Sequence, residues 1–377
     1  MIRSRVRGCA VNAVLFGITL FVCLMAAELI VRQVRPRPLE AASMWPDGTL
    51  RHIPSFSHVY ARPGFSNRVS YNALGLRGPD VPPEPDVTVP RVLFLGDSFV
   101  EGKQVGDSKV LTAVLSDLAR GAGHPLEVIN AGVSGYGTAE EILLWDRLGT
   151  ELRPDLVLLG FYPNDVRNNA DRGLFVLREG RAIPGRPPSR PKVRWVYDTR
   201  KWLAARSHLY MLFTEGLDLL DRPVAGDSVP LEAEDVFARE PPARVAEGWD
   251  LTLALLDDLR ARVESTGARF AVVVFPTRFQ VDDQLWADLT LSRGMDPAGY
   301  DLAIPQRKLE EWAGRSGGAL LDLLPTFRAA RQDGGFYHAV DAHWNEAGHR
   351  LAAEAIYAGL DLPTFTRAGR STVSPSR

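Results

Sequence analysis

The chain has 377 residues, which is enough for one large domain or two ordinary ones with a sizeable core. Its composition, with 45% hydrophobic and 24% charged residues, is that of a globular protein. The formal net charge of −2 gives no electrostatic reason to expect a nucleic-acid partner.

The N-terminal region differs from the rest of the chain. Residues 9–27 contain no charged side chain and follow three arginines. As a helix they rise about 28 Å, close to the hydrocarbon thickness of a bilayer. A cleaved signal peptide usually has a shorter apolar core and small residues before the cleavage site, whereas cleavage after Ala27 would place Met25 at position −3. We therefore predict an uncleaved transmembrane anchor over residues 9–31 and a cytoplasmic tail over residues 1–8.

Basic residues flank this anchor on both sides, so their distribution alone does not orient it. A tail of eight residues ahead of a long domain usually stays inside the cell, which places the domain outside the cytoplasm. Cys9 and Cys23 both lie in the apolar run, so the remaining chain has no thiol to oxidise or to bind a metal. We predict an extracytoplasmic domain that is held at the membrane.

Residues 32–90 are rich in proline and lack helical periodicity, which predicts an extended lead-in segment. Within it the stretch "YNALGLRGPD", Tyr71 to Asp80, mixes apolar residues with turn formers. That mixture indicates an ordered loop rather than a linker.

From Arg91 onward strand and helix patterns alternate. The predicted strands are 91–96, 126–132, 154–165, 268–276 and 319–324, and the predicted helices are 110–119, 139–148, 245–265, 301–314 and 345–360. The strands are apolar almost throughout, which is typical of a parallel sheet covered on both faces. We predict an α/β fold with a doubly wound, mainly parallel five-stranded sheet over residues 91–362, followed by a tail at 363–377.

An insertion over residues 166–243 interrupts the alternation. Between residues 166 and 206 it has eleven Lys or Arg residues against three Asp or Glu. Trp202 to Leu220 is predicted to form one amphipathic helix. The basic excess indicates either a solvated surface or a contact for anionic glycans or phospholipid headgroups.

Polar residues follow the predicted strands, where ligands bind in an open parallel sheet. Ser98 follows the first strand, a glycine-rich loop at 130–137 follows the second, Asn164 ends the third, and Asp341 and His343 come after the fifth. A serine becomes a nucleophile when a histidine takes its proton and a carboxylate orients that histidine. The Ser98 amide, a loop glycine amide and the Asn164 side chain would supply donors for an oxyanion.

These residues resemble the GDSL, or SGNH, hydrolase family, which has a Ser, a Gly, an Asn and a His in four ordered blocks. Ser98, Asn164 and His343 match three blocks, and Gly135 matches the second, with Gly132 as the alternative. The resemblance covers residues 91–165 and 244–360. It implies a flavodoxin-like sheet and a serine esterase. The lead-in "YNALGLRG" and the anchor are similar to a bacterial membrane-anchored subgroup.

One block departs from the family. Its final block is Asp-x-x-His, whereas Asp341 here precedes His343 by two residues. The turn must compensate if Asp341 is to orient the histidine.

Other polar and aromatic residues near these blocks have structural interpretations. We interpret Asp97 as a structural tie for the turn after the first strand and Trp344 as a core residue. His349 is expected at the surface or in packing, and His338 has no matching position in the family.

The sequence therefore predicts a membrane-anchored serine esterase that removes acyl groups, with acetyl favoured, from an ester of the cell envelope through a Ser98 acyl-enzyme. Its expected partners are an ester substrate, such as an acylated polysaccharide or lipid, and the membrane, with no nucleic acid. No metal cluster or phosphate-binding glycine loop is visible, and no cofactor is predicted. Two alternatives stay open: an O-acyltransferase acting on an envelope polysaccharide, and a non-catalytic glycan-binding component with a degenerate triad.

Overall fold

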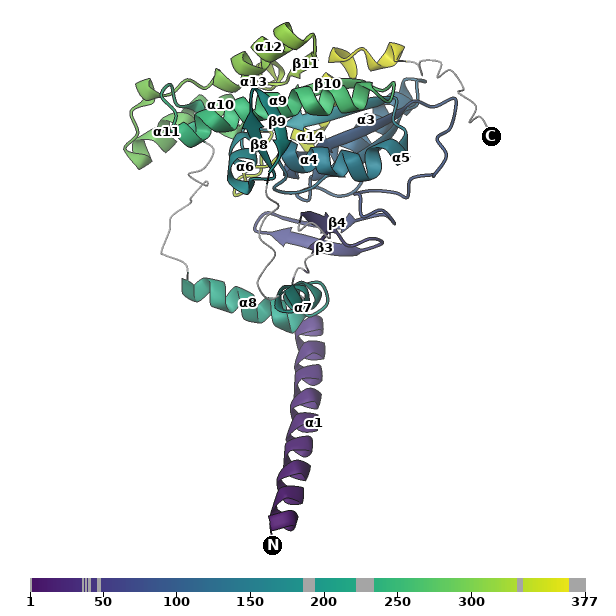
Figure 1. The fold of residues 1–377 in the computed structure, drawn as a ribbon, viewed down its shortest axis with the longest axis vertical. Helices are drawn as coiled ribbons and strands as arrows, with labels where there is room; N and C mark the ends of the chain where they lie inside the picture. Colours follow the sequence, from purple (N-terminus) through teal and green to yellow (C-terminus); the bar gives the residue numbers. More distant parts are fainter. Residues whose placement is uncertain are drawn as a thin grey trace. The chain divides into compact units, whose positions relative to one another are not determined.

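The computed structural model describes residues 2–35, 37, 39, 42–45, 49–185, 194–221, 234–330 and 335–365 (Figure 1). The chain divides into two compact units. One comprises Met1–Ala42 with Pro191–Asp227, and the other comprises Ser43–Arg190 with Ser228–Arg377.

The larger unit is built on a five-stranded parallel sheet. Its strands are β5 (Arg91–Gly96), β6 (Glu127–Gly132), β7 (Leu156–Phe161), β10 (Arg269–Val274) and β11 (Ala319–Asp322). The spatial order is β11-β10-β7-β5-β6. The first strand of the sheet, β5, is therefore an interior strand, and later strands are added on both of its sides. This confirms the predicted doubly wound α/β fold.

Helices cover both faces of this sheet. The helices of the unit are α2 (Ser98–Glu101), α3 (Leu111–Gly121), α4 (Thr138–Leu144), α5 (Thr150–Leu152), α6 (Asp165–Arg172), α9 (Ala243–Glu264), α10 (Arg278–Val281), α11 (Asp283–Arg293), α12 (Ile304–Ser316), α13 (Leu324–Ala329) and α14 (Glu346–Gly359). One apolar core contains side chains of α4, α9 and α12, and a second contains side chains of α3, α13 and α14. The central strands β5 and β7 are fully buried because side chains on both of their faces enter one of these cores.

The helix predicted over residues 139–148 continues from α4 into one π-helical turn, Trp145–Gly149. A Cβ at Gly149 would overlap the indole ring of Trp145, so a glycine is needed where this buried ring packs. Periodicity alone did not indicate the wider turn.

The lead-in is more structured than an extended segment. It contains the strand pairs β1 (Ala42–Met44) with β2 (Leu50–His52) and β3 (Ser57–Arg62) with β4 (Phe65–Ser70). The insertion adds a third pair, β8 (Phe175–Arg178) with β9 (Arg181–Pro184). Three 3₁₀ turns lie at Glu234–Phe237, Pro297–Gly299 and Leu362–Thr364. Most of the predicted C-terminal tail, from residue 366, lies outside the described residues.

The smaller unit contains α1 (Ile2–Val34), α7 (Arg194–Ala204) and α8 (His208–Asp221). The segment Val14–Val34 of α1 is long and apolar enough to cross a membrane. The prediction of a single helix from Trp202 to Leu220 is wrong, because α7 ends at Ala204 and α8 begins at His208. Ser207 causes the break: its hydroxyl accepts a hydrogen bond from Tyr210 N at 3.0 Å and caps a new helix.

Candidate active site

Ser98 lies at the carboxyl end of strand β5, where it begins the short helix α2. Asp97 holds this turn, since its buried carboxylate accepts a hydrogen bond from Phe99 N at 2.9 Å. The same carboxylate accepts from Asn164 Nδ2 at 3.3 Å, which links the ends of β5 and β7. The sequence interpretation of Asp97 as a structural tie agrees with these contacts.

His343 reaches Ser98 from the loop before α14. Its Nε2 lies 2.7 Å from Ser98 Oγ, and its Nδ1 lies 2.5 Å from Asp341 Oδ1. The same oxygen of Asp341 also accepts from the backbone N–H of His343 at 2.9 Å. This tight turn brings a carboxylate two residues earlier onto the histidine ring, so the shortened spacing is compatible with a Ser–His–Asp arrangement.

The environment of Asp341 and His343 favours a charged carboxylate. Burial alone would raise the pKa of Asp341, but its hydrogen bonds and charge interaction with His343 outweigh burial and lower that pKa. The imidazole ring packs against Phe99, with 4.9 Å between the ring centroids. An ionised Asp341 beside an oriented ring can stabilise an imidazolium cation.

The two candidate glycines of the loop after β6 have different surroundings. A Cβ at Gly132 would overlap the backbone nitrogen of Glu101, so Gly132 lets β6 and α2 pack closely. Gly135 lies further along the loop with φ of +78°. Its carbonyl accepts hydrogen bonds from Asn168 Nδ2 at 3.3 Å and from the guanidinium of Arg172. Unlike Gly132, Gly135 has no backbone atom of another described segment packed closely against its Cα.

Glu101 is a residue near the site that the sequence interpretation missed. Its carboxylate is fully buried and accepts from Tyr71 Oη at 2.5 Å and from Ser134 N at 2.7 Å. It also lies 2.9 Å from His52 Nε2. Burial alone would raise its pKa, but Lys103, His52 and the hydrogen bonds lower that pKa well below the ordinary value. Glu101 thus joins the Ser98 helix to the lead-in and to the residue before Gly135.

Arg77 makes a second connection between the lead-in and the Ser98 turn. Its buried guanidinium donates to the carbonyl oxygens of Glu101 and of Val105, the latter at 2.7 Å. The expectation that residues 71–80 form an ordered loop agrees with this docking. A signal was present in the sequence, because an arginine and a tyrosine in an otherwise apolar loop require buried partners.

A buried carboxyl cluster, consisting of Asp97, Glu141 and Asp165, lies beneath the site. Burial raises the pKa of each, to about 6 for Asp97 and well above the ordinary value for Glu141 and Asp165, and repulsion from neighbouring carboxylates adds to each rise. In the part of the chain that the structure describes, neither carboxylate oxygen of Glu141 has a hydrogen-bond partner. Burial therefore favours the neutral carboxyl form most strongly at Glu141 and Asp165.

The remaining histidines and Trp344 have packing roles. His349 is buried, and its Nδ1 accepts a hydrogen bond from Leu111 N at 3.2 Å. His338 packs against Phe65, with ring centroids 4.6 Å apart. Trp344 is fully buried in the core. Within the described ranges, no group of His, Cys, Asp or Glu side chains is arranged to hold a metal ion.

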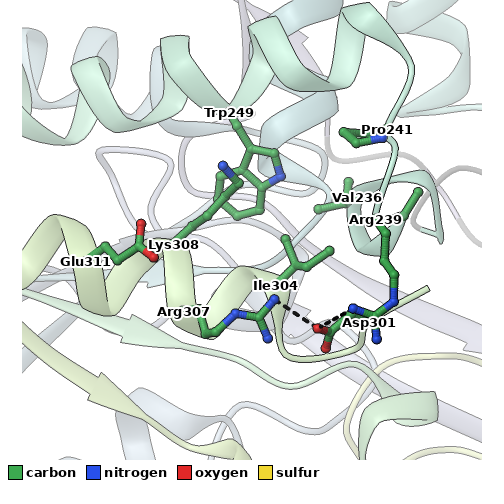
Figure 2. A pocket seen from close by; sticks show the side chains of 10 residues that line it. Val236, Arg239, Pro241, Trp249, Asp301, Ile304, Arg307, Lys308 and Glu311 are labelled. Carbon is green, nitrogen blue, oxygen red and sulfur yellow. Dashed lines mark hydrogen bonds and ion pairs between the residues drawn. The ribbon is translucent and has the colours of Figure 1, made fainter. Parts of the chain in front are cut away.

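A pocket of about 350 Å³ is lined by none of these site residues (Figure 2). Figure 2 shows Asp301 between Arg239 and Arg307, at 3.4 Å and 2.9 Å respectively. Asp301 thus pairs with two of the arginines that line the pocket, whose lining also contains Lys308 and Glu311.

The chain matches the model of the GDSL-like lipase/acylhydrolase family over residues 94–351. A comparison with curated proteins found no match. Similar solved structures include TesA, at 14% identity and a TM-score of 0.40, covering 72% of this chain and 99% of that chain. They also include a catalytic mutant of Axe2, an acetylxylan esterase from Geobacillus stearothermophilus, at 15% identity and a TM-score of 0.41, covering 76% and 100%. A G-D-S-L family protein from Desulfitobacterium hafniense has 12% identity and a TM-score of 0.38, covering 71% and 98%.

The matched segment contains Ser98, His343 and Asp341 and spans the whole five-stranded sheet apart from the first residues of β5. The chain belongs to the GDSL-like lipase/acylhydrolase family, whose activity is the hydrolysis of ester bonds.

Proposed function

We propose that this protein is a membrane-anchored serine esterase that deacylates an ester substrate of the cell envelope, outside the cytoplasm. One observation carries the proposal: Ser98 Oγ lies within hydrogen-bonding distance of His343 Nε2, and His343 Nδ1 lies within hydrogen-bonding distance of Asp341 Oδ1. The apolar segment of α1 supports the anchor.

In this proposal Ser98 Oγ attacks the carbonyl carbon of the ester while His343 Nε2 takes the hydroxyl proton. The carboxylate of Asp341 stabilises the imidazolium that results. The tetrahedral intermediate collapses, His343 returns the proton to the leaving alcohol, and an acyl group remains on Ser98. A water molecule, deprotonated by His343, then releases the acid and restores the serine.

The negative oxygen of the tetrahedral intermediate needs donors that are already in place. The backbone N–H groups of Ser98 and Gly135 and the side-chain amide of Asn164 are the proposed donors. Asn164 Nδ2 uses one of its two hydrogens toward Asp97, which fixes the amide and leaves the other hydrogen for the oxyanion.

The test is hydrolysis by the full-length protein in detergent micelles, with p-nitrophenyl esters of increasing chain length and with acetylated polysaccharide. Ser98→Ala should lose at least about a thousandfold in turnover, because the residual rate would come from substrate binding and the oxyanion donors alone. Ser116→Ala is the matched control, since Ser116 lies on α3 and its hydroxyl donates to Leu126 O, just before β6, at 2.7 Å.

Retained hydrolysis in Ser98→Ala would contradict the proposal. Faster transfer of the acyl group to an added polysaccharide than to water would contradict the hydrolase assignment and favour an O-acyltransferase that uses the same residues.

A further inference from the structure

Helix α8 begins at a fixed level along α1. The carboxylate of Glu28 on α1 accepts hydrogen bonds from Ser207 Oγ at 2.8 Å, His208 N at 3.0 Å and Leu209 N at 2.9 Å. These are the otherwise unpaired donors at the start of α8. Arg32, one turn further along α1, donates to the carbonyl oxygen of Arg206 at 3.1 Å. The turn between α7 and α8 is therefore attached to residues 28–32 of α1.

If α1 crosses a bilayer, the position of Glu28 along α1 fixes the depth at which α8 begins. Glu28 is the first charged residue after the uncharged run 9–27. Because this run rises about 28 Å as a helix, it fills the hydrocarbon layer and leaves Glu28 at the boundary with the headgroups. Helix α8 starts at that boundary and runs across the axis of α1 within the same unit (Figure 1).

The two helices present large apolar side chains outward at this level. Trp202 on α7 is 56% exposed and Phe213 on α8 is 63% exposed. The guanidinium of Arg206 lies 5.4 Å from the centroid of the Trp202 ring, and Arg200 is also exposed. Aromatic rings beside arginines are typical of the membrane–water interface, where the ring enters the hydrocarbon edge and the guanidinium reaches the phosphates.

We propose that the α7–α8 surface, defined by Trp202, Phe213, Arg200 and Arg206, lies in the headgroup layer of the membrane that α1 crosses. The inference rests on the proposed membrane anchor. Its partner is a bilayer containing anionic lipid, because α7 and the turn after it, residues 194–206, have four basic residues and one acidic residue. Helices α7 and α8 thus form an interfacial platform that holds the end of α1, and not merely a solvated surface.

The test uses the full chain in nanodiscs of phosphatidylcholine, with and without phosphatidylglycerol. Cys9 and Cys23 are replaced by Ala, and a nitroxide label is attached at Leu20→Cys, Trp202→Cys or Phe213→Cys in turn. Collision of the label with oxygen, which dissolves in lipid, is compared with collision with a water-soluble nickel chelate. Leu20 should show the highest ratio of oxygen to nickel collisions. Labels at 202 and 213 should show a ratio several-fold above that of a label free in water.

Anionic lipid should raise the ratio at position 213. Arg200→Gln with Arg206→Gln should remove that increase, whereas Arg120→Gln, an exposed arginine on α3, should preserve it. Circular dichroism and ester hydrolysis by each labelled protein show that it is folded.

The outcomes separate the two claims. A deep label at Leu20 with water-like labels at 202 and 213 would overturn the interfacial platform and leave the anchor. A water-like label at Leu20 would overturn the anchor and the platform together. Labels at 202 and 213 shielded from both reagents would show that a protein covers the surface, which would also overturn the platform.

Discussion

Two sets of carboxyl groups near the Ser98 turn have opposite environments. Asp341 is partly accessible, with a side chain that is 17% exposed, and it accepts two hydrogen bonds from His343. The buried carboxyl cluster of Asp97, Glu141 and Asp165 is closed to solvent, and burial raises each of its pKa values. The pKa of Asp341 is instead lowered. Asp341 is thus kept charged, whereas burial favours the neutral form of Glu141 and Asp165.

The contrast explains why only one of these carboxylates is suited to orient the histidine. A group that stabilises an imidazolium must be ionised at neutral pH, and Asp341 meets that requirement. Asp97 is closer to the nucleophile in sequence, but its carboxylate is engaged by Phe99 N and Asn164. The carboxylate that contacts His343 is therefore not the one nearest Ser98 in the sequence. It is Asp341, as the hydrogen bonds show.

The largest effect should come from removing the charge of Asp341. Asp341→Asn should lower kcat by up to about 10⁴-fold, because the amide presents the imidazole in the wrong tautomer. Steady-state hydrolysis of p-nitrophenyl acetate measures the loss, with Asp117→Asn, an exposed residue on α3, as the control. A loss of roughly tenfold or less, beside an inactive His343→Ala, would indicate a Ser98–His343 dyad and break the comparison.

A smaller effect on activity is expected for Glu101→Gln. The NH₂ group of the new amide cannot accept the hydrogen bond that Ser134 N donates to the carboxylate of Glu101. We expect a fall in kcat of roughly 10- to 100-fold with little change in KM, because the loop that holds Gly135 would move relative to Ser98. Unfolding stability should fall by about 1–3 kcal/mol.

The control for Glu101 is Glu127→Gln at the start of β6, where the carboxylate pairs with buried Arg91 at 2.7 Å. It should lose stability while keeping kcat. An equal loss of kcat in both variants would reduce Glu101 to a purely structural residue.

Glu141→Gln should change stability and leave turnover intact. The raised pKa of Glu141 means that the folded state holds its proton more tightly than the unfolded state, so stability is lost as pH rises above the unfolded value. Removing the charge should abolish this loss, and the advantage of the variant should grow with pH by up to about 1.4 kcal/mol per unit. Urea unfolding from pH 5 to pH 9 tests this, and a constant offset at every pH would contradict it.

Much of the fold was predictable because local patterns coincide with burial in this molecule. The five strands are apolar on both faces, and polar residues follow them at one edge of the sheet. The predicted final helix begins at Asn345, whose side chain caps it by accepting a hydrogen bond from Gly348 N at 3.0 Å. The positions of Ser98, Asn164 and His343 along the chain follow from the same pattern.

The remaining features depend on contacts between distant segments, which a local pattern does not contain. Glu101 meets His52, Tyr71 and Ser134, and only the folded lead-in brings these together. The first N–H groups of α8 bind Glu28, which lies about 180 residues earlier in the chain. The hydrogen bond from His343 N to Asp341 Oδ1 is local, but it depends on a turn whose shape the altered spacing could not predict.

The most direct test of the central claim is covalent labelling of the nucleophile. The full-length protein is treated with a fluorophosphonate, digested and analysed by mass spectrometry. We expect one phosphonylated site in the native protein, Ser98, and no labelling in Ser98→Ala. Labelling should be strongly slowed in His343→Ala, because an unassisted serine hydroxyl is a weak nucleophile. Undiminished labelling of Ser98→Ala, or an adduct on another serine of the native protein, would contradict it.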